Sequence, residues 1–198
     1  YNADNYSVLD NFKLEYYGNL TSNQPTANSL VINEIMASNV DEFISPAFNF
    51  DGWIELYNPS DQFVMLDGLT ISDTANEEGP WRMPAGMGVI PAKGFRVIWF
   101  DSNDIAPQNA PFKLDTDGGT IAIADESGTV IAEQGYPASK ERVSYARKQD
   151  GTGEWGLTAS ATPGASNNGV AFASEQLAAP EVNVPSKLFR SEEHTSEL

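Results

Sequence analysis

The sequence predicts an all-β protein built as a β-sandwich, and three observations support this fold class. About eight short apolar segments recur at intervals of roughly 8 to 12 residues, as in sandwiches of antiparallel strands. The 16 Gly and 12 Pro residues lie mainly between these segments, where they favour turns. No segment keeps the period of about 3.6 residues that an amphipathic helix requires.

Two strands joined by a long loop are expected between Leu30 and Ser60, in LVINEIMASN and DGWIELYNPS. In the second strand Ile54 and Leu56 share one face, and Glu55 lies on the other between Trp53 and Tyr57. This alternation is typical of a half-buried strand. One face should therefore build the core, while the other meets solvent or a second layer.

The rest of the domain is expected to consist of short strands with Gly or Pro turns. Pro84 and Pro91 remove backbone donors, so the part around them should be irregular or lie at a sheet edge. In the most apolar strand, GFRVIWFD, alternate residues Phe95, Val97 and Trp99 are expected to face the core. The expected strands after residue 60 lie at 63–66, 69–72, 89–90, 95–100, 112–114, 121–123, 129–132 and 142–147.

Composition excludes several classes of function. The 198 residues carry a formal net charge of -17, which disfavours duplex DNA and anionic lipid as partners, because phosphate binding needs a basic surface. The absence of Cys removes disulfides, zinc thiolate sites and cysteine nucleophiles. No apolar run approaches the roughly 18 to 20 residues of a transmembrane helix. The chain opens at Tyr1 without a signal-peptide pattern, and we expect it to be a fragment of a larger protein.

Several motifs together resemble the lamin tail domain as it occurs in bacterial exported proteins. They are INEI (32–35), WIELYN (53–58), LDGLTISD (66–73), GFRVIWFD (94–101), FKLDTDGGTIAIADESGTVI (112–131) and TPGASN (162–167). The resemblance implies an immunoglobulin-like β-sandwich with Greek-key topology. It also implies an accessory or interaction module, rather than an enzyme, that is extracellular or at the cell surface.

The flanks suggest pieces of other domains around a lamin tail domain at 29–169. Residues 1–18 resemble the closing strand of a preceding β-sandwich, with an extra edge strand of the main domain as the alternative; 19–28 and 170–180 are expected linkers. Residues 181–189 resemble the start of a chitobiase-type C-terminal sandwich, an arrangement found in proteins with a CotH-type kinase domain. Residues 190–198, RSEEHTSEL, resemble a translated sequencing adapter, and they hold the single His of the chain, His194.

Acidic residues on the paired strands and their loop form the candidate metal site Glu34, Asp51 and Glu55. Sandwich loops can supply the oxygen ligands that Ca²⁺ prefers, but no D-x-D-x-D-G loop occurs, so no cofactor is expected and Ca²⁺ stays an alternative. Glu34 and Glu55 could also act as a general acid and base. The simpler hypothesis is that each bonds to neighbouring backbone or to Arg82 or Arg142.

Aromatic residues are the candidate ligand-binding groups, namely Trp81, Trp53 and Tyr57. Their rings could stack on sugars or anchor a protein partner, although packing is the more common role. The sequence therefore predicts a non-catalytic module that binds a protein or glycan at the cell surface. The alternatives are a Ca²⁺-assisted carbohydrate-binding module and an accessory domain of a CotH-type kinase or extracellular hydrolase.

Overall fold

The computed structural model describes residues 29–74, 79–102 and 106–173, and the regular elements in these ranges are all β-strands. No helix that could cross a membrane is found in the described ranges. The strands are β1 (Val31–Met36), β2 (Gly52–Tyr57), β3 (Val64–Met65), β4 (Thr70–Asp73), β5 (Trp81–Arg82), β6 (Val89–Ile90), β7 (Phe95–Phe100), β8 (Gly119–Ala124), β9 (Val130–Tyr136), β10 (Ser144–Gln149) and β11 (Thr152–Thr158).

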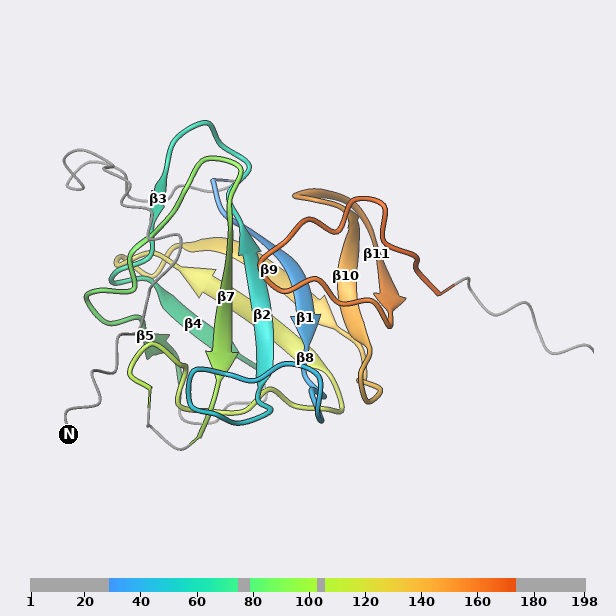
Figure 1. The fold of residues 1–198 in the computed structure, drawn as a ribbon. Helices are drawn as coiled ribbons and strands as arrows, with labels where there is room; N and C mark the ends of the chain where they lie inside the picture. The colour runs from blue at the N-terminus through green and yellow to red at the C-terminus, as the bar shows by residue number, and fades with distance from the viewer. Residues whose placement is uncertain (1–28, 75–78, 103–105, 174–198) are drawn as a thin grey trace, which may run out of the picture.

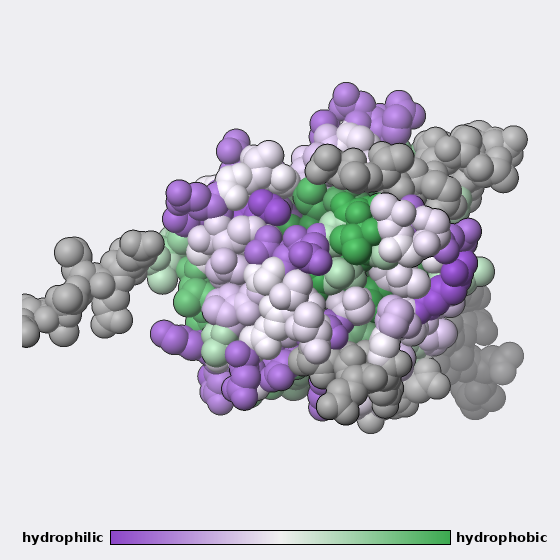
Figure 2. Space-filling model, turned by 180° about the vertical axis from the view of Figure 1, so that it is seen from behind, coloured by the Kyte–Doolittle hydropathy of each residue, from purple (hydrophilic) through white to green (hydrophobic). Residues whose placement is uncertain are grey.

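Two antiparallel sheets form an immunoglobulin-like β-sandwich, so the predicted fold class is confirmed. The larger sheet has the order β11-β10-β1-β2-β7 and the smaller one β5-β4-β8-β9, while β3 and β6 make a separate two-stranded ribbon. In Figure 1 strands β7, β2 and β1 lie in front of β4, β8 and β9. Seen from behind, the surface is mostly hydrophilic or weakly polar, with hydrophobic residues near the centre and at one side (Figure 2).

The core lies between the facing surfaces of the two sheets. Ile54 and Leu56 point into it from β2, as their spacing predicts, and neither is exposed. Ile121 and Ile123 enter it from β8 on the other sheet. Burying an aliphatic side chain of this size contributes about 1.5 to 3 kcal/mol, so this shared layer is the main source of stability.

Strand β7 has the opposite orientation to the predicted one. Ile98 and Phe100 are buried in the core, whereas the expected core stripe of Phe95, Val97 and Trp99 is half-buried on the other face. Apolar residues occupy both faces of this strand, so the two-residue period could not choose between them. The face of the five-stranded sheet that points away from the core, called the outer face below, is therefore aromatic along β7.

A β-bulge at Asn33 sets the orientation of β1. Ile32 pairs with Leu56 and Glu34 pairs with Glu55, so Asn33 is an extra residue opposite β2. Without the bulge, strict alternation would place Ile32 and Glu34 on the same face. With it, Ile32 enters the core and Glu34 lies on the outer face.

One expected strand is absent from the described residues, and one expected turn is present. Residues 112–114 are not a strand, although Phe112 and Leu114 are buried. The predicted turn at Ser127-Gly128 is present between β8 and β9, and Gly128 has a φ of 86°. The flanking segments predicted at 1–18, 19–28, 181–189 and 190–198 lie outside the described residues. The domain limits of 29–169 stay a prediction.

Candidate functional site

Glu34 and Glu55 lie side by side on the outer face, as directly paired residues of β1 and β2. Neither side chain is exposed to solvent. The Ser144 hydroxyl and Glu34 Oε1 share a short hydrogen bond, and Oε2 of Glu34 accepts from the Thr162 backbone N–H at 3.1 Å. Glu55 accepts from Asn33 Nδ2 at 3.0 Å and from the Gly164 backbone N–H at 2.7 Å.

The segment that seals these carboxyl groups is residues 160–168, called the clasp below. It follows β11 and crosses the outer face of the five-stranded sheet (Figure 1). Thr162-Pro163-Gly164-Ala165 forms a turn in which Ala165 N–H donates to Thr162 O at 2.9 Å and Gly164 has a φ of 81°. Pro followed by a positive-φ Gly is the signature of a type II turn, so the TPG sequence itself specifies this bend.

Asp150 ties the other end of the clasp to β1. Its Oδ1 accepts from Asn33 Nδ2 at 3.0 Å and from the Asn167 N–H at 2.9 Å, and its Oδ2 accepts from the Ser166 hydroxyl. Asn167, which is almost fully buried, donates from Nδ2 to Asn33 O at 3.2 Å. The result is one hydrogen-bond network that joins three carboxyl groups through the clasp and Asn33.

Burial raises the pKa of both glutamates. The pKa of Glu55 is raised to about 8, mainly by desolvation and further by repulsion from Glu34 and Asp150. The hydrogen bonds from Asn33 and Gly164 lower this pKa but do not offset the increase. Desolvation also raises the pKa of Glu34, against the lowering effect of its bonds to Ser144 and Thr162. Of the predicted partners, backbone groups do bond to both glutamates, through Thr162 and Gly164, whereas Arg82 pairs with Glu126 and Arg142 with Asp41 instead.

This arrangement gives the glutamates no access to a substrate. Both are fully buried, and neither lines the two surface cavities described below. A general acid must reach the proton acceptor of a bound substrate within hydrogen-bond distance. The chemistry available to the pair in the described structure is to hold protons and to bind backbone amides.

The structure does not bring Asp51 together with Glu34 and Glu55. Asp51 lies four residues before Glu55, a separation of about 13 Å along an extended strand, and its Oδ2 accepts from the Ser45 hydroxyl at 2.6 Å. Within the described ranges, no group of three or more His, Asp or Glu side chains could hold a metal ion. The Ca²⁺ alternative would therefore need a rearrangement of these residues.

A second candidate site is the loop between β1 and β2, residues 37–51, called the aromatic loop below. Its buried polar side chains brace it from within. Asn39 Nδ2 donates to Phe43 O at 2.6 Å and to Asp51 O at 2.9 Å, while the Ser45 hydroxyl bonds to Asp51. Phe43 also packs edge-on against Trp53, with ring centroids 5.9 Å apart. The backbone of the loop is thus fixed although it has no regular secondary structure.

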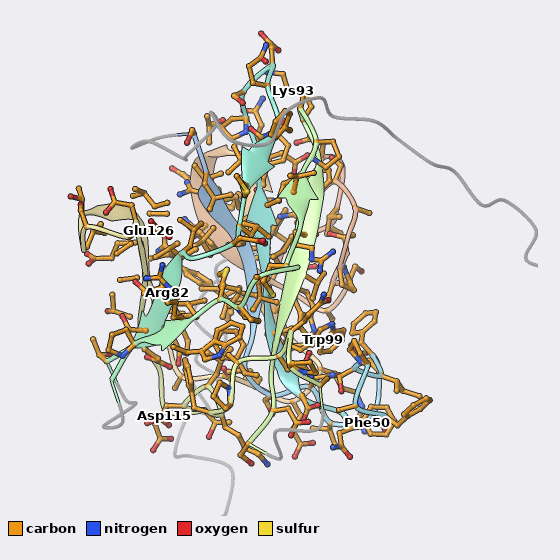
Figure 3. The ribbon with its side chains drawn as sticks, turned by 90° about the vertical axis from the view of Figure 1, so that its left-hand side faces the viewer. Phe50, Arg82, Lys93, Trp99, Asp115 and Glu126 are labelled. Carbon is orange, nitrogen blue, oxygen red and sulfur yellow. The ribbon has the colours of Figure 1, made fainter. Side chains whose placement is uncertain are left out.

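The same loop exposes four large apolar side chains. Phe48 is 90% exposed, Ile44 61%, Phe50 45% and Val40 41%. Outside this loop, Val130 is the other exposed large hydrophobic residue in the described ranges. Figure 3 shows Phe50 and Trp99 at the same end of the molecule, on the side opposite Arg82 and Glu126. The exposed large apolar side chains of the described ranges are therefore concentrated in the aromatic loop.

A surface cavity of about 230 Å³ adjoins the aromatic loop. Phe50, Asp51 and Asn39 line it from the loop, and Lys113 and Thr116 line it from the segment before β8. A second cavity, of about 370 Å³, lies beside the Arg82–Glu126 ion pair and Met83. The first combines an exposed ring with both signs of charge, which suits recognition of a polar group next to an apolar anchor.

The aromatic residues singled out from the sequence occupy different environments. Trp53 is completely buried beneath Phe43 and next to Trp99, so its ring offers no face to a ligand. Tyr57 is half-buried and packs against Phe95, and Trp81 is half-buried on the short edge strand β5. Sequence analysis missed Phe48 and Phe50, although the pattern SPAFNFD could have revealed them as aromatic residues in a polar loop.

Comparison with protein families identifies a family to which the chain is similar. The family model described as Lamin Tail Domain matches residues 23–138. No curated protein matches the chain. The match ends before β10, β11 and the clasp, which the structure nevertheless places in and over the same sheet.

Proposed function

The chain belongs to the lamin tail domain family, a family of immunoglobulin-like domains, and from this premise we propose that it is a non-catalytic binding module of a larger exported or cell-surface protein. The observation that carries the proposal is the aromatic loop. It exposes four large apolar side chains on a backbone that buried polar groups hold in place. Any catalytic activity of the parent protein would lie outside residues 29–173.

Rigidity of the loop supports binding because it lowers the entropic cost of association. A loop that is ordered before binding loses little further freedom when a partner docks. Phe48 adds a second argument, since its φ of 62° is strained for a residue with a Cβ. Such strain is often found at functional sites, where the surrounding structure maintains it.

Charge indicates the chemistry of the partner. The aromatic loop contains no Lys or Arg and exposes Glu42; its Asp41 pairs with Arg142 and its Asp51 is buried, but the whole chain still has a formal net charge of -17. A complementary partner would offer an apolar pocket or aliphatic side chains flanked by Lys or Arg. We therefore assign a basic protein surface or peptide as the partner of the aromatic loop.

Selection from a displayed random peptide library against the full chain tests this assignment. Selected peptides should be enriched in Lys or Arg beside Leu, Ile or Phe. The double variant Phe48→Ser, Phe50→Ser should weaken their binding by about tenfold or more, as expected for hot-spot residues. The control Val130→Ser, which removes an exposed apolar side chain elsewhere, should leave binding unchanged.

Two results would contradict the proposal. One is a set of peptides that bind equally well to the double variant and to the unchanged chain. The other is the absence of any enriched peptide, because a rigid apolar platform should select at least weak binders.

A glycan partner remains the second candidate, since the cavity beside Phe50 combines a ring with the polar side chains of Asn39, Asp51 and Lys113. Sugars bind to this combination through ring stacking and hydrogen bonds. Binding on a glycan array that is lost in Phe50→Ser would favour a sugar at this cavity. Loss in Trp81→Ala instead would place the sugar at β5.

A further inference from the structure

Glu34, Glu55 and Asp150 share one network that contains no cation. Among the described residues, no Lys or Arg side chain bonds to any of them. Arg147 donates to the Ile32 and Gly153 carbonyls, and Lys148 pairs with Glu154. From β7, the residue paired with Glu55 is Val97, which carries no charge. Two adjacent buried carboxyl groups without a cation cannot both be ionised at low cost.

Hydrogen-bond geometry shows where a proton fits. Glu34 Oε1 faces the Ser144 hydroxyl, which can accept as well as donate, so a proton on Oε1 has a partner. Glu34 Oε2 and both oxygens of Glu55 face N–H donors, from Thr162, Asn33 and Gly164. A neutral Glu34 therefore keeps its hydrogen bond to Ser144 and still leaves a carboxyl oxygen for each of the three N–H donors around the pair.

The clasp depends on these carboxyl groups for its attachment. Within the described ranges, the hydrogen bonds from Thr162 and Gly164 to the sheet go to Glu34 and Glu55, while Asn167 bonds to Asp150 and to Asn33 O. Gly164, Ala165 and Ser166 are exposed, so little apolar burial holds this turn down. Beyond it, Ala173 N–H donates to Leu157 O at 2.8 Å and the Thr158 hydroxyl to Ala171 O at 2.8 Å, which ties the far end to β11.

We propose that the clasp is a proton-locked strap: it stays closed over β1 and β2 while Glu34 and Glu55 hold at least one proton between them, and it opens as a loop, with the sandwich intact, when both ionise. Opening lets water reach the two carboxylates and removes their mutual repulsion in a dry site. The bonds near Thr158 and Ala171 keep the two ends of the open loop close together.

The direction of the effect follows from the raised pKa values. With the clasp open, each Glu is solvated and has an ordinary pKa near 4.5, whereas in the closed state burial raises the pKa of both, that of Glu55 to about 8, so the pair holds a shared proton more tightly. A carboxyl group with a higher pKa in the closed state favours closure at low pH. The closed state is therefore most stable below about pH 4.5, and it weakens as the pH rises toward about 8.

Amide hydrogen exchange of the full chain, followed by NMR, tests whether closure of the clasp depends on these protons. Protection factors of the Thr162 and Gly164 amides, corrected for intrinsic exchange, should fall by about tenfold per pH unit between about pH 6 and 8. Protection of Ile121 and Ile123 in β8 should not change, because the sandwich stays closed.

Glu34→Gln is the informative variant. Its amide nitrogen can donate to Ser144 and its oxygen can accept from Thr162, so it replaces a protonated Glu34 without losing a hydrogen bond. Its clasp protection should fall less steeply with pH between 6 and 8 than that of the unchanged chain, because the amide replaces the proton on Glu34 and removes its repulsion of Glu55, although the burial that raises the pKa of Glu55 remains. The matched control Glu133→Gln removes a charge from an exposed position on β9 and should behave like the unchanged chain.

Three outcomes would contradict the proposed proton-dependent closure of the clasp. The first is clasp protection that does not depend on pH in the unchanged chain. The second is loss of protection in β8 together with the clasp, which would mean global unfolding. The third is an equal pH dependence in the Glu34→Gln variant, which would mean that this pair does not hold the proton.

Discussion

At the scale of single residues, buried asparagines fix the irregular parts of this domain. Asn33, Asn39, Asn58 and Asn167 are each at most 5% exposed. An amide side chain can donate two hydrogen bonds and accept two, so it can satisfy several backbone groups where the sheet ladder ends. Asn58, directly after β2, has the carbonyls of Gln62, Ile90 and Pro91 around its Nδ2 at 2.6, 3.0 and 2.9 Å, so one of its two N–H groups is shared between two acceptors.

Asn58→Ala should destabilise the domain by about 3 kcal/mol, because it leaves buried carbonyl groups without donors. Urea unfolding followed by tryptophan fluorescence measures this change. Gln62→Ala, at an exposed position nearby, serves as the control and should change the free energy of unfolding by less than about 0.5 kcal/mol. An equal effect of the two substitutions would refute the role given to Asn58.

At the scale of elements, the two segments that matter most have no regular secondary structure. Buried polar side chains hold both segments: Asn39 and Asp51 brace the aromatic loop from within, and Glu34 and Glu55 of the neighbouring strands hold the clasp. Side-chain hydrogen bonds replace the ladder bonds that a strand would have made. Such segments can be well ordered while presenting side chains that a sheet would not expose.

Phe48→Asn should stabilise the domain by about 1 kcal/mol while weakening partner binding. Asparagine tolerates a positive φ better than phenylalanine does. The ring of Phe48 is 90% exposed, so its removal costs little packing. Thermal unfolding measures the gain, and Phe50→Asn, at a residue without a positive φ, should give none. A loss of stability in Phe48→Asn would show that the ring contributes to the fold rather than to binding.

At the scale of the whole molecule, stability comes from the core and is opposed by charge. The described ion pairs, such as Arg82–Glu126 and Arg142–Asp41, have side chains that are about half-exposed or more. Exposed pairs of this kind contribute about 0 to 1 kcal/mol each. A formal net charge of -17 leaves a large excess of carboxylates, whose mutual repulsion favours expansion of the chain.

Salt should therefore stabilise the protein by screening, without a specific effect of calcium. Raising NaCl from about 0.01 to 0.3 M should increase the thermal midpoint by about 3 °C. At matched ionic strength, about 5 mM CaCl₂ and MgCl₂ should act alike, because Asp51 lies apart from Glu34 and Glu55. A calcium-specific increase that Asp51→Asn abolishes would instead establish the Ca²⁺ alternative.

The sequence by itself determined the features that depend on local patterns. The alternation in GWIELY fixed the core face of β2, and Ser127-Gly128 fixed a turn that needs a positive φ. The motifs that resemble a lamin tail domain fixed the fold class. Each of these depends on neighbours in the chain, or on a family pattern, which a sequence contains in full.

Only the tertiary structure decided what the polar residues do. The bulge at Asn33 turns Glu34 to the same face as Glu55, and the clasp, over 100 residues later in the chain, covers both. Neither a bulge nor a covering segment leaves a periodic signal. Burial of a carboxyl group, and hence its pKa, depends on segments that are distant in sequence and meet only in the folded protein. The sequence therefore reveals two glutamates on strands, while the fold makes them a sealed pair.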